Sequence, residues 1–76
     1  MDKLLEILED LLPGEDLENN ERLVDNHILD SLTILSLVAE IEDKFDVTVP
    51  AVAIVPANFN SVKAIYTMIM SLQEDN

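Results

Sequence analysis

Ser31 and the polar residues just before it are the part of this 76-residue sequence best placed to do chemistry. Asp30 and Ser31 precede a run with helical periodicity, and both residue types favour a helix start, where they accept hydrogen bonds from unpaired backbone N–H groups. An anion attached to the Ser31 hydroxyl would lie beside such N–H groups and the positive end of the helix dipole. A phosphodiester at Ser31 would therefore need no basic side chain to hold it.

The same segment permits a catalytic and a metal-binding interpretation. Asp25, His27 and Ser31 have the residue types of a hydrolase triad, but nothing in the sequence supplies a separate oxyanion hole or a substrate cleft. Residues 25–27 together with Asp30 could contact a divalent cation, although their spacing lacks the Gly and the closing Glu of a calcium loop. We expect no built metal site, no catalysis by the chain itself, and no special role for His27.

Composition limits the partners. Sixteen acidic residues against four basic ones give a net charge of −12, which repels nucleic acids and anionic lipid headgroups, so we expect basic protein partners and no nucleic acid. The absence of cysteine means that any thiol chemistry must come from outside the chain. The apolar runs are far shorter than the roughly 20 residues that span a bilayer, and Asp2 and Glu6 lie where a signal peptide would be positive. These features predict a cytoplasmic protein without membrane insertion.

Three main helices are predicted to position Ser31. Apolar residues recur at helical spacing from Asp2 to Leu12, and Pro13-Gly14 ends that helix. The second helix is expected from Ser31 to Phe45, followed by an extended segment before Pro50. Residues 51–55 fit either one short helical turn or a short strand. Asn60-Ser61 is predicted to cap a last helix that runs to about Leu72.

A long acidic loop is predicted between the first two helices, over residues 15–30. Apolar residues recur along it and should attach it to the core: Leu17, Leu23, Val24, Ile28 and Leu29. The length allows one domain, residues 1–76, with one modest core. The predicted fold class is therefore all-α, a small bundle of three main helices plus one short helix, and we expect a monomer.

The second helix is apolar on two sides. Its core stripe consists of Ile34, Leu37, Val38, Ile41 and Phe45. On the opposite side lies a second apolar set, which we call the outer strip: Leu32, Leu35 and Ala39, interleaved with Ser36 and Asp43. A chain of this size has too little material to cover both sides, so we predict that the outer strip faces solvent and contacts partners. The alternative is that the loop folds over it.

The run His-Ile-Leu-Asp-Ser-Leu at residues 27–32 resembles the attachment motif of acyl carrier proteins. Residues 45–50 and 58–62 resemble further segments of that family in the same order, so the likeness covers the whole chain. It implies that Ser31 carries a covalent 4′-phosphopantetheine arm, moved from coenzyme A by a phosphopantetheinyl transferase, whose metal and nucleotide Asp30 helps to bind. It also implies that partner enzymes contact Leu32, Leu35, Ala39 and Asp43.

Departures from the motif indicate the subclass. Bulky Ile28-Leu29 resembles the Leu-Leu-Asp-Ser of D-alanyl and other aminoacyl carriers, and Thr33 and Ser36 replace acids common in fatty-acid synthesis carriers. We therefore expect a carrier that shuttles a thioester-bound acyl or aminoacyl group. Its partners would be an adenylating ligase or an acyltransferase with a basic docking surface. The alternative is an acidic helical interaction module without a prosthetic group, in which Ser31 only caps a helix.

Overall fold

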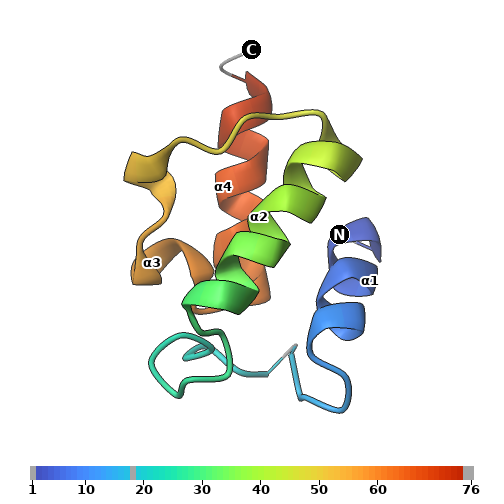
Figure 1. Ribbon diagram of the computed structural model, residues 1–76, viewed down its shortest axis with the longest axis vertical. Helices are drawn as coiled ribbons and strands as arrows, with labels where there is room; N and C mark the ends of the chain where they lie inside the picture. Colours follow the sequence, from blue (N-terminus) through green and yellow to red (C-terminus); the bar gives the residue numbers. More distant parts are fainter. Residues whose placement is uncertain (1, 18, 75–76) are drawn as a thin grey trace.

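The computed structural model describes residues 2–17 and 19–74, which form an all-α fold (Figure 1). Its helices are α1 (Asp2–Leu11), α2 (Ser31–Phe45), α3 (Pro56–Phe59) and α4 (Val62–Glu74), with a 3₁₀ turn, η1, at Ala51–Ala53. The predicted fold class, the three main helices and the long loop between α1 and α2 are confirmed. Within the described residues, no helix has the length and apolarity needed to cross a bilayer.

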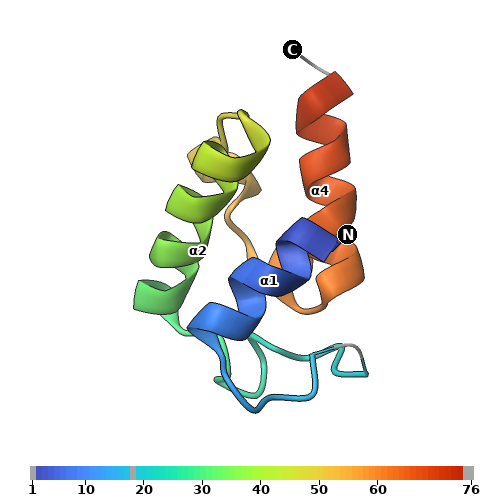
Figure 2. The same ribbon diagram turned by 90° about the vertical axis from the view of Figure 1, so that its right-hand side faces the viewer.

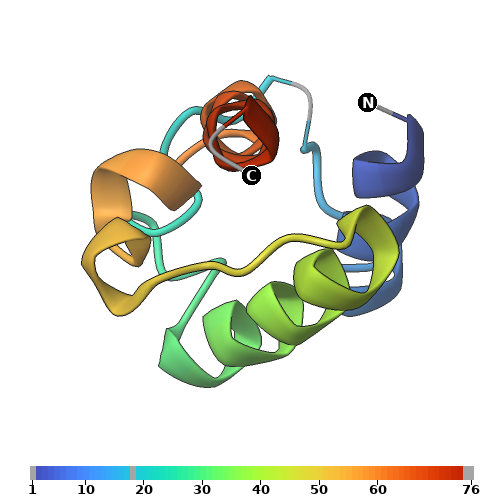
Figure 3. The same cartoon turned by 90° about the horizontal axis from the view of Figure 1, so that it is seen from above.

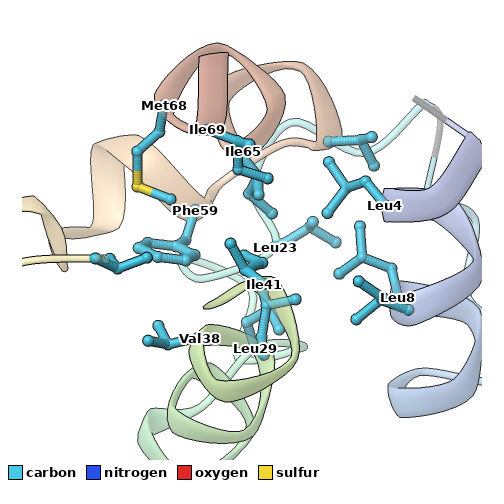
Figure 4. Close-up of a cluster of buried hydrophobic side chains, with 14 of the residues drawn as sticks. Leu4, Leu8, Leu23, Leu29, Val38, Ile41, Phe59, Ile65, Met68 and Ile69 are labelled. Carbon is cyan, nitrogen blue, oxygen red and sulfur yellow. The ribbon is translucent and has the colours of Figure 1, made fainter. Parts of the chain in front are cut away.

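The helices surround a single apolar centre. Figure 2 shows α1 crossing in front of the space between α2 and α4, and Figure 3, seen from above, shows α1, α2, η1 with α3, and α4 arranged around that centre. Phe59 of α3 is completely buried there and lies among side chains from the helices and the loop (Figure 4). The other fully buried residues are Leu4, Leu8, Leu23, Leu29, Leu37, Ile41, Ile65 and Ile69.

The loop between α1 and α2 is attached to the core as predicted. Gly14 ends the first helix region with a φ of 84°, in the left-handed range that favours glycine. Three of the predicted loop anchors are buried and the other two are half-buried; the set is Leu17, Leu23, Val24, Ile28 and Leu29. Glu21 and Asp25, which lie between these anchors, are exposed, so this part of the loop contributes apolar area to the core without burying their charges.

Asn60 ties this loop to the junction of α3 and α4. Its backbone carbonyl accepts a hydrogen bond from the Leu23 N–H at 2.8 Å. Its side-chain Oδ1 accepts from the N–H groups of Val24 and Asp25 at 3.0 and 3.1 Å. The cap of the last helix is therefore provided by Ser61, whose Oγ accepts from the Ala64 N–H at 3.0 Å, while the Asn60 amide serves the loop.

The connection from α2 to α4 differs in part from the prediction. Residues 51–53 form the expected helical turn rather than a strand. A further one-turn helix, α3, begins at Pro56 and was not predicted from the sequence. Proline suits the first position of a helix, because its fixed φ is helical and its missing N–H would have had no partner there. This turn places Phe59 in the core.

Two side chains that sequence analysis missed secure the C-terminal end of α2. The Glu42 carboxylate accepts a hydrogen bond from the Val49 N–H at 2.9 Å, which folds the chain back after the helix. Lys3 of α1 donates to the Lys44 carbonyl at 3.2 Å, and its ammonium lies 5.4 Å from the centre of the Phe45 ring. Together they fix α2 against α1 and against the following segment.

Candidate functional site

Ser31 is the first residue of α2, and its side chain is exposed. Asp30 is the N-cap: its backbone is extended, and its Oδ1 accepts from the Thr33 N–H at 2.8 Å. Because Asp30 supplies the cap, the Ser31 hydroxyl is not needed for that purpose. Ser61, at the start of α4, differs, because its hydroxyl accepts the capping hydrogen bond and its side chain is half-buried.

The Asp30 carboxylate also sets the charge beside Ser31. The hydrogen bond from the Thr33 backbone N–H, supported by that of Leu32, lowers the pKa of the Asp30 carboxyl below its ordinary value. Asp30 is thus ionised at neutral pH. As expected for a helix cap, Asp30 accepts one of the N–H groups at the start of α2 and places a negative charge at that helix end.

A surface groove of about 510 Å³ adjoins Ser31. The residues that line it come from the start of α2, the end of the loop and the segment that joins η1 to α3. Most of its wall is apolar, and its polar side chains are those of His27, Asp30 and Ser31. The remaining lining residues are Val24, Leu29, Ile34, Leu35, Ile54 and Pro56. The sequence gives no periodic signal for this groove, because three separate segments form it.

The outer strip of α2 faces solvent. Leu32 and Leu35 are 76% and 59% exposed, and Ala39 is exposed as well, so the loop does not fold over them. Leu37, Val38 and Ile41 on the other side are buried, while Ile34 and Phe45 of the core stripe are half-buried. The strip begins one residue after Ser31, and Leu35 also lines the groove.

Acidic residues continue the outer strip towards the end of α2. Asp43 is exposed, and its carboxylate lies 3.6 Å from the Lys44 ammonium, which also pairs with Glu40 at 3.4 Å. The Glu40 carboxylate, with Asp43 adding to it, raises the pKa of Lys44. This exposed pairing leaves the carboxylates accessible to a basic partner, because surface ion pairs of this kind are weak.

One of the groups considered for a triad or a metal site has a different partner. The Asp25 carboxylate accepts a hydrogen bond from the Asn60 side-chain amide at 3.4 Å, and Asp25 does not line the groove that His27 and Ser31 share. Over residues 2–17 and 19–74, no three His, Asp or Glu side chains are arranged to hold a metal ion.

The family model described as "Phosphopantetheine attachment site" matches residues 2–69. The chain belongs to the phosphopantetheine-binding carrier family. It is therefore a carrier that bears phosphopantetheine and is not an enzyme, which decides against both the hydrolase triad and the interaction module without a prosthetic group. The exposed hydroxyl of Ser31 and the largely apolar groove beside it fit such a group, which supplies the thiol that the chain lacks.

Carrier proteins from Lactobacillus helveticus and from two Listeria species are similar to this chain. The D-alanyl carrier protein of Lactobacillus helveticus is 31% identical over 74 residues, 95% of this chain and 92% of that relative. The D-alanyl carrier proteins of Listeria welshimeri and Listeria monocytogenes are 41% and 39% identical over 51 residues. Those two matches span 64% of this chain and 65% of the Listeria proteins. No solved structure matches the chain.

Proposed function

We propose that Ser31 bears the phosphopantetheine arm and that the carrier is loaded with an amino acid, D-alanine in the first instance, by a ligase that adenylates it. The observation that carries the proposal is the exposed Ser31 hydroxyl at the start of α2, freed from capping by Asp30 and open to the adjoining groove. We expect loading to take place in the cytoplasm, where coenzyme A and ATP are available.

The other serines are poorer acceptors. The Ser61 hydroxyl accepts the cap hydrogen bond of α4 and is half-buried. Ser36 and Ser71 are exposed, but they lie inside α2 and α4, where no helix N-terminus supports an attached phosphate. Ser31 alone among these four combines exposure with a helix start.

Asp30 and the outer strip are the residues that we expect partner enzymes to contact. The Asp30 carboxylate is ionised, exposed and next to the acceptor hydroxyl, so it can approach the metal ion of a phosphopantetheinyl transferase. Leu32, Leu35 and Ala39 offer apolar contact area, and Asp43 adds negative charge on the same helix. A transferase or ligase with a basic surface complements this arrangement and the net charge of −12.

The assignment of an aminoacyl cargo rests on the relatives and on the motif. The curated relatives above are named D-alanyl carrier proteins. Ile28-Leu29 before Asp30 resembles the motif of aminoacyl carriers, and both residues pack into the core side of the loop.

Intact-mass measurement tests the attachment and the cargo in two stages. Incubation with coenzyme A and a broad-specificity transferase is expected to add one phosphopantetheine to the wild type and to Ser36→Ala and Ser61→Ala, but none to Ser31→Ala. Modification of Ser31→Ala, or failure of the wild type with several transferases, would contradict the attachment site.

In the second stage, the modified protein is incubated with ATP, D-alanine and a D-alanine-adenylating ligase, with L-alanine as the matched control. We expect the mass of one alanyl group with D-alanine and much less with L-alanine, and we expect hydroxylamine to remove it because it is a thioester. If D-alanine is not loaded but an acyl ligase loads a fatty acid efficiently, the aminoacyl cargo is refuted. Ser31 would remain the attachment site in that case.

A further inference from the structure

His27 has an unusual backbone conformation close to Ser31. Its φ is 62°, in the left-handed region that residues other than glycine rarely adopt. Backbone hydrogen bonds hold the turn in place: the His27 N–H donates to the Val24 carbonyl at 3.0 Å, and the N–H groups of Ile28 and Leu29 both donate to the Leu23 carbonyl. In this turn His27 is exposed and lines the groove that also contains Ser31.

Apart from the N-terminus of α2, the residues around Ser31 offer little that would favour an anion. The ionised Asp30 lines the same groove and takes the Thr33 N–H. Asp25 lies two residues before His27 in the loop, and the segment from Ile54 to Pro56 on the far wall contributes no titratable side chain. Neither Arg22 nor any lysine lines the groove. His27 is therefore the one residue of the groove lining that can carry positive charge.

Resting on Ser31 as the attachment residue, we propose that the His27 imidazole is a positioning residue that donates a hydrogen bond to the phosphodiester of the attached arm. A protonated imidazole offers two N–H donors, and a hydrogen bond from a cation to a phosphate oxygen is stronger than a neutral one. The contact offsets the repulsion between the phosphodiester and Asp30. It holds the base of the arm at the groove.

Phosphorus NMR of the modified protein tests this contact, with the modification itself checked first by mass. Histidine changes charge between about pH 5 and 8, so the phosphodiester resonance is expected to shift with an inflection in that range. Asp30 is not the source of such an inflection, because the hydrogen bond from the Thr33 N–H lowers the pKa of its carboxyl and keeps it ionised there. The inflection should weaken at high salt, which screens the two charges.

His27→Gln keeps a hydrogen-bond donor but removes the titration, and His27→Gly removes the side chain while favouring the same φ. Both variants are expected to accept phosphopantetheine and to lose the inflection. Arg22→Gln is the matched control, because it removes a positive charge from the same loop outside the groove, and its inflection should match that of the wild type.

The outcomes separate the two proposals. A flat phosphorus titration in the modified wild type, or an inflection that persists in His27→Gln, would overturn the His27 contact and leave Ser31 as the attachment residue. An inflection lost equally in Arg22→Gln would show a general charge effect and would also overturn it. A phosphorus signal that appears on Ser31→Ala would instead refute the attachment site, and the His27 contact with it.

Discussion

The two sides of α2 are made of similar residues but have opposite environments. Leu37, Val38 and Ile41 are buried in the core, whereas Leu32 and Leu35 are more than half exposed. Burying such side chains contributes about 1.5–3 kcal/mol each, and the outer strip forgoes this gain in the free protein. Apolar periodicity therefore identifies helix faces that can pack against other apolar groups. The size of the chain decides which of these faces the protein itself covers.

The largest effect on stability is expected on the buried side of α2. Ile41→Ala should lower the free energy of unfolding by about 2–5 kcal/mol, because the removed carbon atoms leave a cavity in the cluster of buried side chains. Leu35→Ala should cost a small fraction of that, since its side chain is already 59% exposed. Urea unfolding of both variants measures the difference, and equal losses would mean that the outer strip belongs to the core in solution.

An intermediate effect is expected on the exposed side, where function rather than stability should change. Leu35→Ala and Asp43→Lys should each slow modification by the transferase several-fold while leaving the unfolding midpoint nearly unchanged, because docking needs apolar contact for residence and opposite charge for encounter. Raised ionic strength should reproduce the Asp43→Lys effect but not that of Leu35→Ala. Glu74→Lys, an equal charge reversal at the end of α4, is the control and should leave the rate close to that of the wild type.

The smallest effect is expected for Asp30, the N-cap residue of α2. The hydrogen bond from the Thr33 N–H lowers the pKa of Asp30 in the folded state, so its contribution to stability is complete above its unfolded pKa and is lost as pH falls through the lower, folded value. The melting temperature of Asp30→Ala should therefore lie below that of the wild type near neutrality, and the gap should narrow below about pH 4. Asp30→Asn keeps an acceptor that does not titrate, so its advantage over Asp30→Ala should persist in acid. A gap that widened in acid would contradict the role of the carboxylate.

Much of the fold was predictable because its signals are local. Asp30 and Phe45 bound α2 as the pattern indicates, and the apolar residues of the loop reach the core. The exposure of the outer strip was also predictable, because a chain of 76 residues is too short to cover both sides of α2. All these inferences need only neighbours along the helix and the total length of the chain.

The parts that sequence reasoning missed depend on contacts between distant residues. The Asn60 amide bonds to residues 35 and 36 positions earlier, and polar residues next to a helix start look alike whether they cap it or not. The left-handed φ of His27 follows from a turn closed by Val24 and Leu23 rather than from its residue type. The groove beside Ser31 needs three segments at once, so no single stretch of sequence indicates it.

The hydrogen bonds between Asn60 and the loop have a consequence for how a carried group reaches a partner enzyme. A group on a flexible arm can reach any point within the arm's length, but the volume it sweeps is centred on the pivot to which the arm is attached. Asn60 fastens residues 23–25 to the junction of α3 and α4, so an arm attached at Ser31, as we propose, would have its base in a loop that is held against the rest of the molecule. A partner enzyme that binds only the surface of α2 would then also have the attachment residue, and so the base of the arm, in a defined position.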